Sequence, residues 1–145
     1  MEPTIKAGET IRIQMDAYKR SSPQRWDVVA FNPPLHSVPA GSNTDNLGIW
    51  IFRIVALPGE TVSFDDAGLL LNGTSPLDRP PSIERIHYKK TTASGMPDRP
   101  RSPAYPITVP AGNYFILGDN PNQANDSRVW GVLPRENILF KVVNK

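Results

Sequence analysis

The chain has 145 residues, no cysteine, and a net charge of +2 from 16 Lys and Arg residues against 14 Asp and Glu residues. The absence of thiols excludes disulfides and cysteine-ligated metals, and the balanced charge gives no indication of a nucleic-acid partner. Sixteen prolines and ten glycines exclude a mainly helical fold, because proline lacks an N–H donor and clashes with the preceding helical turn.

Short apolar or alternating runs predict about eight β-strands separated by turns. The strongest prediction covers residues 49–57, which are mostly β-branched or aromatic and end at the Pro58-Gly59 turn. Asn72-Gly73 predicts a tight hairpin turn. We expect a mostly β domain, a barrel or a folded-over sheet, whose strand order does not follow from the sequence. The other predicted strands cover residues 11–15, 27–31, 61–64, 69–71, 107–109, 113–117 and 138–143.

Residues 75–106 differ in composition from the rest of the chain, with many prolines, mixed charges and few large apolar side chains. We expect an insertion with little core of its own and one further strand at 84–90. The stretch from Arg85 to Arg101 is the most basic of the chain, but turn-forming residues and Asp98 interrupt it. This pattern favours a solvated loop over a nucleic-acid-binding stripe.

The two histidines, His36 and His87, have no carboxylate or second histidine at ligand spacing. They therefore predict neither a metal site nor a Ser-His-Asp triad. The sequence holds no glycine-rich phosphate-binding motif, so no cofactor is expected. No apolar run approaches the roughly 18 residues of a membrane helix, and the first residues lack the basic and apolar regions of a signal peptide.

The loop 118–131 gathers acidic, amide and basic side chains between two predicted strands. Asp119, Asp126 and Arg128 are its charged members. Two interpretations stay open at this point. Either these side chains satisfy backbone groups of a long polar turn, or their ion pairs fix a neighbouring site.

Four segments are distinctive when taken together: Met1–Ile5, Arg25–Phe31, Arg53–Glu60 and Gly118–Gly131. They resemble, in order and nearly over the whole chain, the motifs of signal peptidase I, the membrane-anchored serine protease that removes signal peptides from exported proteins. The last two segments are the most specific.

The resemblance implies one catalytic-core domain over residues 1–145, a coiled sheet with a barrel-like core of the LexA type that self-cleaving repressor peptidases share. Residues 75–106 then take the place of the family's small and variable second domain. The implied partners are signal peptides of exported preproteins and a membrane, reached through an anchor upstream of Met1, with no cofactor and no nucleic acid. The domain would lie on the extracytoplasmic side of that membrane.

In this family a serine hydroxyl attacks the scissile carbonyl and a neutral lysine accepts its proton. The resemblance places that serine directly before Met1, and the position of the lysine holds Phe52. Ala124 stands where many bacterial members have a serine that orients the lysine. The resemblance thus assigns no catalytic residue to this chain, which we expect to be truncated upstream of Met1.

We therefore expect a serine endopeptidase domain for signal peptides that is inactive as this chain. One alternative is a non-catalytic peptide-binding or assembly module in protein export. A second is an active peptidase with a recruited base, for which Lys6 and Lys19 are the nearest candidates. An engineered loss of activity or a different alignment register is the third.

Other functional positions of the family carry over to this sequence. The two predicted ion pairs, Arg53 with Asp119 and Asp126 with Arg128, would be structural. Ordinary core is the alternative for each predicted pocket residue, and the bulk of Trp50 would narrow or reshape the pocket. The predicted substrate-binding residues are Met1, Ile5, Ile11, Ala30, Trp50 and Ile51.

Overall fold

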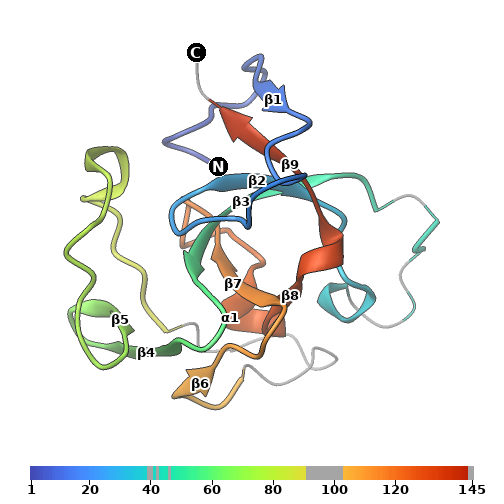
Figure 1. The fold of residues 1–145 in the computed structure, drawn as a ribbon. Helices are drawn as coiled ribbons and strands as arrows, with labels where there is room; N and C mark the ends of the chain where they lie inside the picture. The colour runs from blue at the N-terminus through green and yellow to red at the C-terminus, as the bar shows by residue number, and fades with distance from the viewer. Residues whose placement is uncertain (39–40, 42, 46, 91–102, 144–145) are drawn as a thin grey trace.

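The computed structural model describes residues 1–38, 41, 43–45, 47–90 and 103–143, and it is mostly β, as predicted (Figure 1). The helical segments are short: α1 (Ser127–Trp130) and the 3₁₀ turns η1 (Leu35–Ser37), η2 (Pro81–Ile83) and η3 (Arg135–Asn137). The strands are β1 (Arg12–Gln14), β2 (Val28–Phe31), β3 (Trp50–Ala56), β4 (Thr61–Asp65), β5 (Gly68–Leu71), β6 (Ile107–Thr108), β7 (Asn113–Leu117), β8 (Leu133–Pro134) and β9 (Ile138–Val143).

The strands form two antiparallel sheets. The larger has the order β1-β9-β2-β3-β7-β8, and the smaller has the order β5-β4-β6. The register skips Leu139 of β9 opposite Ala30 and Phe31, and it skips Val55 of β3 opposite Phe115 and Ile116. These bulges bend β9 and β3. In Figure 1 the strands β2, β3, β7, β8 and β9 accordingly curl around a common interior.

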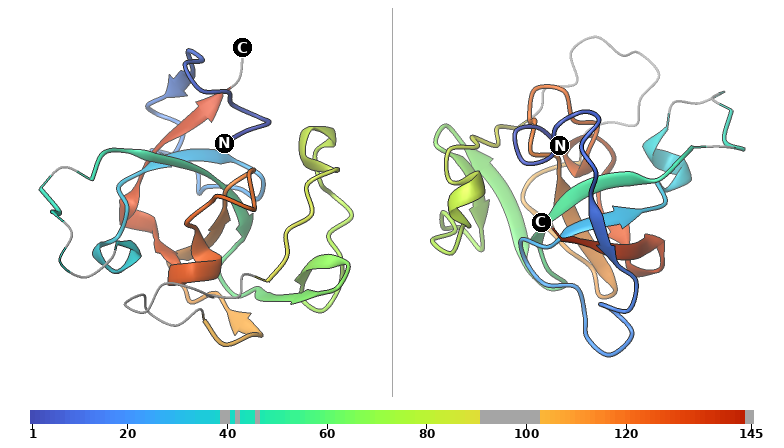
Figure 2. Two further views of the ribbon diagram at one scale, coloured as in Figure 1. Left: turned by 180° about the vertical axis from the view of Figure 1, so that it is seen from behind. Right: turned by 90° about the horizontal axis from the view of Figure 1, so that it is seen from above.

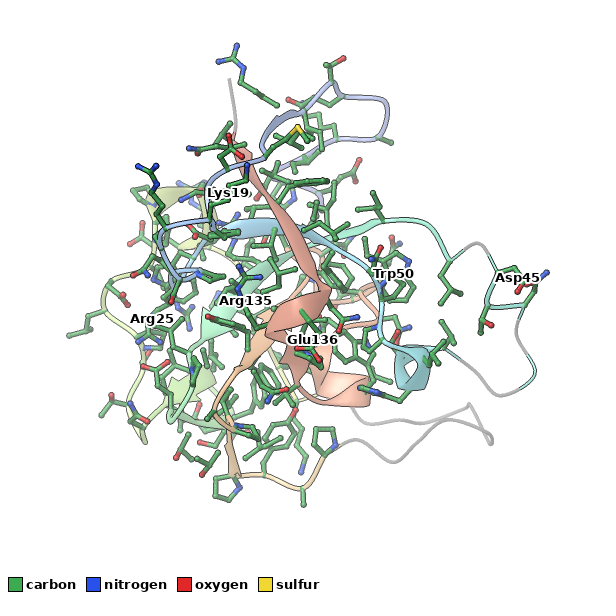
Figure 3. The ribbon with its side chains drawn as sticks, turned by 45° about the vertical axis from the view of Figure 1, so that its right-hand side comes forward. Lys19, Arg25, Asp45, Trp50, Arg135 and Glu136 are labelled. Carbon is green, nitrogen blue, oxygen red and sulfur yellow. The ribbon has the colours of Figure 1, made fainter. Side chains whose placement is uncertain are left out.

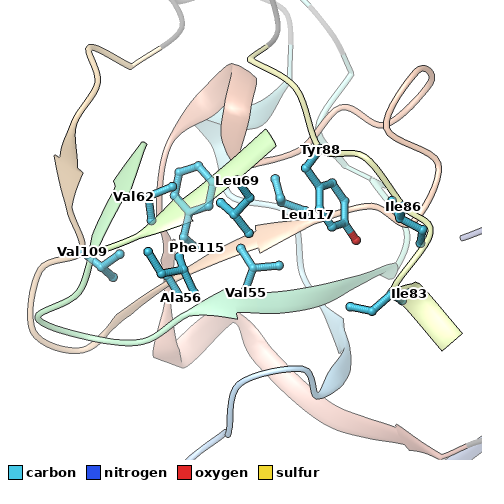
Figure 4. Close-up of a cluster of buried hydrophobic side chains, with 11 residues drawn as sticks. Val55, Ala56, Val62, Leu69, Ile83, Ile86, Tyr88, Val109, Phe115 and Leu117 are labelled. Carbon is cyan, nitrogen blue, oxygen red and sulfur yellow. The ribbon is translucent and has the colours of Figure 1, made fainter. Parts of the chain in front are cut away.

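Alternation along β3 divides the core between the two faces of the larger sheet. Ile54 packs inside the curled sheet with the buried side chains of β2 and β7, whereas Val55 faces the smaller sheet. The close-up in Figure 4 shows this second cluster, in which Val55 and Phe115 meet Val62 and Leu69. Both faces of β2 and of β7 are covered, which explains why these strands read as apolar runs rather than as alternating strands. The smaller sheet covers the outer face of β7, and the N-terminal segment covers that of β2.

The strand predicted at 84–90 is wrong, because this segment forms no ladder. Its apolar alternation has another cause: Ile86 and Tyr88 are buried in the cluster of Figure 4, together with Ile83. The segment runs beside the curled sheet, on the side of β4 and β5 (Figure 2). Residues 91–102 lie outside the described residues, so the bounds 75–106 of the insertion stay a prediction.

The sequence did not predict β8 and α1, which are too short to show a hydrophobic period. The predicted turn at Asn72-Gly73 is present, with φ angles of 51° and 81°. It joins Leu71 to Thr74 through a backbone hydrogen bond of 3.0 Å, at the end of β5.

Trp26 has a φ of 70°, in the left-handed region that disfavours any residue with a Cβ atom. Its indole is half-buried against the cluster that contains Val55. We predict that Trp26→Gly is more stable than Trp26→Ala by about 1 kcal/mol, because both lose the indole but only glycine relieves the backbone. Urea unfolding measures the difference.

The matched control is Ser22, an exposed residue whose φ is not positive. There the usual order should hold, with alanine at least as stable as glycine. If Trp26→Ala equalled or exceeded Trp26→Gly in stability, the proposed backbone strain would be absent.

Candidate active site

A cleft of about 610 Å³ opens between the N-terminal segment, the start of β3 and the loop that follows β7. The ladder between β3 and β7 pairs Arg53 with Leu117. One residue further along, Phe52 of β3 lies opposite Gly118, which follows β7, and both residues line the cleft. The apolar lining residues are Met1, Ile5, Ala7, Ile49, Ile51, Phe52, Gly118 and Ala124. The polar lining residues are Glu2, Lys6, Asn120, Gln123 and Asn125.

The phenyl ring of Phe52 packs against the backbone of Gly118. A Cβ atom added at Gly118 would lie 3.1 Å from Cε1 of Phe52 and 2.5 Å from Cβ of Ala124. Phe52 also contacts the rings of Phe31 and Trp50, at centroid distances of 5.7 and 6.1 Å. This wall of the cleft is therefore apolar and closely packed, and it requires glycine at position 118.

Beside this wall lies Asp119, whose side chain is buried and accepts hydrogen bonds from three segments. Arg53 donates through Nε at 2.9 Å and through Nη2 at 2.6 Å in a bidentate pair. The Tyr88 hydroxyl donates at 3.1 Å, and the Thr4 hydroxyl donates as well. The network fixes the N-terminal segment, β3 and the segment 84–90 around one carboxylate.

Asp126 holds the far end of the same loop. Its carboxylate accepts from Nε and Nη2 of Arg128 at 2.9 and 2.8 Å and from the Gly118 amide at 3.0 Å. It also caps α1 by accepting from the Arg128 amide. Arg128 in turn donates to the carbonyls of Pro121 and Lys89. Of the two interpretations left open for this loop, the structure shows both at once: ion pairs and capped backbone groups.

The structure brings five of the six predicted pocket residues into one apolar cluster, with Val28, Val142 and Phe140. Trp50 is the exception, because its side chain belongs with Phe52 to the cluster inside the curled sheet and does not line the cleft. It packs against Phe31, and its Nε1 donates to the Leu47 carbonyl at 3.2 Å. The five are Met1, Ile5, Ile11, Ala30 and Ile51, of which Met1, Ile5 and Ile51 line the cleft.

The two lysines considered as recruited bases are separated by the fold. Lys6 lines the cleft with an exposed side chain. Lys19 lies on the surface, 2.5 Å from Asp16, and does not line the cleft. In Figure 3, Lys19 lies to the left of β9 and Trp50 to its right.

No group of His, Cys, Asp and Glu in the described part of the chain is arranged to hold a metal ion. Over the same residues, no helix has the length and apolar character to cross a membrane. His36 lies against the ring of Trp130, at a centroid distance of 6.0 Å, and His87 lines a neighbouring cleft.

Sequence reasoning missed three contributors to the site. Thr4 belongs to the first quoted motif, so its place beside Asp119 could have been suspected. Gly118 opens the last motif, and only the register of β3 and β7 brings it to Phe52. Tyr88 lies in a segment without motif, and no pattern in the sequence points to its bond with Asp119.

The comparisons with known proteins agree with this geometry. A family model described as "Signal peptidase, peptidase S26" matches residues 1–144. The chain belongs to this family. A probable signal peptidase I-1 of Synechocystis sp. is 32% identical over 139 residues, which are 96% of this chain and 62% of that protein.

Two further signal peptidases extend the match. Signal peptidase I of Leptolyngbya laminosa is 30% identical over 143 residues, which are 99% of this chain and 62% of that protein. A crystal structure of a signal peptidase I from Enterococcus faecalis has a TM-score of 0.55 and 29% identity, covering 85% of this chain and 98% of that one. The chain thus spans about three-fifths of the length of these cyanobacterial relatives.

The packing of Phe52, Gly118 and Ala124 makes a testable prediction for this signal-peptidase domain. Gly118→Ala should destabilise the fold by about 1–3 kcal/mol, because the new methyl overlaps the Ala124 Cβ. Ala124→Gly in the same chain should recover part of that loss by removing the closest contact. Denaturant unfolding of the two single variants and the double variant measures the coupling, and simple additivity would contradict the packing.

A second prediction concerns the four tyrosines, whose pKa values are all raised, first of all by burial. Asp119 raises the pKa of Tyr88 further. A phenol whose pKa is raised by folding stabilises the fold fully below its unfolded pKa of about 10, and this stabilisation is lost as the pH rises above that value. Phenolate absorbance should therefore appear together with the loss of circular dichroism, above pH 10.

Tyr88→Phe tests the contribution of Tyr88 to this effect. It should lower stability at neutral pH by about 1 kcal/mol, through the lost bond to Asp119, and weaken the alkaline dependence. A phenol that titrates near pH 10 while the circular dichroism stays native would show that the tyrosines are not protected.

Proposed function

We propose that this chain is a signal-peptidase-fold domain that binds extended segments of exported preproteins in the cleft without hydrolysing them. The observation that carries the proposal is the phenyl ring of Phe52 in the cleft wall, packed on Gly118. The signal peptides, the extracytoplasmic placement and a membrane anchor outside residues 1–145 belong to the same proposal.

The chemical argument starts from the dyad of the family. A serine becomes a nucleophile when a neighbouring neutral amine accepts its proton. By resemblance, Phe52 holds the position of that amine, and a phenyl ring has no lone pair to accept a proton. Ala124 also lacks the hydroxyl that would orient an amine. The two differences agree with each other, because a hydroxyl at position 124 has no amine to orient when position 52 holds a phenyl ring.

Peptide binding does not depend on these two positions. The apolar cluster of Met1, Ile5 and Ile51 remains at the cleft and can accept small side chains by size exclusion. Exposed Ile49 extends the apolar surface at the rim. The chain thus keeps an apolar surface for a peptide but has no amine at the position of the catalytic base. This combination favours a peptide-binding or assembly role in protein export.

A second candidate function rests on Lys6, which also lines the cleft. In that reading the chain is an active peptidase whose base comes from the N-terminal segment. Lys6 is exposed, whereas burial against apolar neighbours is what keeps a lysine base neutral. This difference makes the binding function the better supported of the two.

The experiment uses the natural protein, with whatever residues its gene encodes before Met1. It is mixed with a peptide that carries two alanines at the small-residue positions of a signal peptide, and with one that carries leucines there. We expect binding of the first, at least tenfold weaker binding of the second, and no cleavage product of either by mass spectrometry. Hydrolysis of the first peptide would overturn the proposal.

Variants separate the two candidate functions. Ile49→Arg at the cleft rim should weaken binding, whereas Leu35→Arg, at a residue that is also exposed but lies outside the cleft, should not. If the natural protein cleaves the peptide and Lys6→Ala abolishes cleavage, the second candidate function, with Lys6 as the base, is correct. In the binding function, Lys6→Ala leaves the absence of cleavage unchanged, and hydrolysis gained by Phe52→Lys with Ala124→Ser would support the assigned positions.

A further inference from the structure

A second cleft, of about 840 Å³, adjoins the first. It lies between the segment 81–90 and the loop 119–122, and the two clefts share Glu2 and Asn120 in their linings. An extended peptide advances about 3.3 Å per residue, so a few residues beyond the small-residue pair suffice to reach the second cleft.

The second cleft differs from the first in charge. Its walls carry the exposed cations Arg85, Lys89 and Lys90, with His87 between them. Within the described ranges, none of these four forms an ion pair with a carboxylate. Lys90 instead lies 5.7 Å from the centroid of the Tyr105 ring.

The acidic groups of this cleft do not neutralise these cations. Asp119 is held in its bidentate pair with Arg53, and Arg128 is likewise neutralised by Asp126. Glu2, at the junction with the first cleft, is the other carboxylate in the lining. Three permanent cations therefore face one available carboxylate, which leaves a positive field in the cleft.

The cationic wall is also fixed in place. Arg128 donates to the Lys89 carbonyl at 3.3 Å and to the Pro121 carbonyl at 2.9 Å, which ties the two walls together. Ile86 and Tyr88 alternate with the cationic residues and are buried in the core. Their burial turns the side chains of Arg85, His87 and Lys89 outward on the same side of the segment. The backbone that carries these side chains is therefore fixed before any ligand binds.

We propose that this cleft binds an acidic stretch of the same peptide that occupies the first cleft, next to its small-residue pair. The inference rests on the proposed peptide-binding function and adds its substrate class: small residues flanked on one side by carboxylates. Continuity with the peptide cleft favours a peptide over other anions.

The test compares three peptides of equal length: the dialanine peptide, and the same peptide with two glutamates placed either before or after the small-residue pair. Because the cationic cleft lies at one end of the first, one placement should bind about tenfold tighter at low salt, and the other should not. The gain should fall below about twofold in 0.5 M NaCl, since exposed ion pairs are screened.

The variant Arg85→Glu/Lys89→Glu should abolish this gain and leave the affinity for the neutral peptide unchanged. Arg20→Glu is the matched control, because Arg20 is exposed and lines neither cleft. Unchanged thermal melting of each variant shows that its fold is intact.

Three results would overturn the inference: no gain with either placement, a gain that survives the double charge reversal, or an equal gain from both placements. Binding of the neutral peptide in those cases leaves the proposed function standing, whereas its failure to bind removes that function by itself. Displacement of the acidic peptide by vesicles of anionic lipid, but not by neutral ones, would assign the cleft to a lipid headgroup instead.

Discussion

The buried carboxylate of Asp119 is the constraint on which the site depends. An isolated charge at this depth would be strongly unfavourable, so every segment that supplies it with a donor is held in position. Arg53 supplies a bidentate pair from β3, Thr4 supplies a hydroxyl from the N-terminal segment, and Tyr88 supplies another from the segment 84–90. The N-terminal segment lines both clefts, β3 lines the first and the segment 84–90 lines the second, so one carboxylate joins the walls of both.

This network holds the segments around the first cleft together without a contribution from Phe52 or Ala124. Asp119 is paired with Arg53, and Asp126 is paired with Arg128, so each charge has its own partner. Neither ion pair involves Phe52 or Ala124. Phe52 instead belongs to an aromatic cluster that fills the curled sheet. A phenyl ring stabilises this position by packing, whereas an amine at the same place would have to be desolvated.

The two clefts adjoin one another but differ in their linings. The first carries aliphatic side chains such as Met1, Ile5 and Ile51, and the second carries cations whose backbone is anchored through Ile86 and Tyr88. Residues 85–90, the described start of the most basic stretch of the sequence, thereby form one wall of the second cleft. Their buried side chains alternate with their exposed cations, and this alternation, rather than strand pairing, accounts for their pattern.

The sequence by itself determined the β class, most strand positions and the family, because hydrophobic period, turn residues and motif order are local properties of the chain. It also determined that no amine stands at position 52. The order β1-β9-β2-β3-β7-β8, the contact of Phe52 with Gly118 and the bond of Tyr88 to Asp119 were decided only by the tertiary structure. The physical reason is register: strand pairing over long sequence separations brings Gly118 to Phe52, and a one-residue shift, invisible in local patterns, would turn the Phe52 ring to the other face.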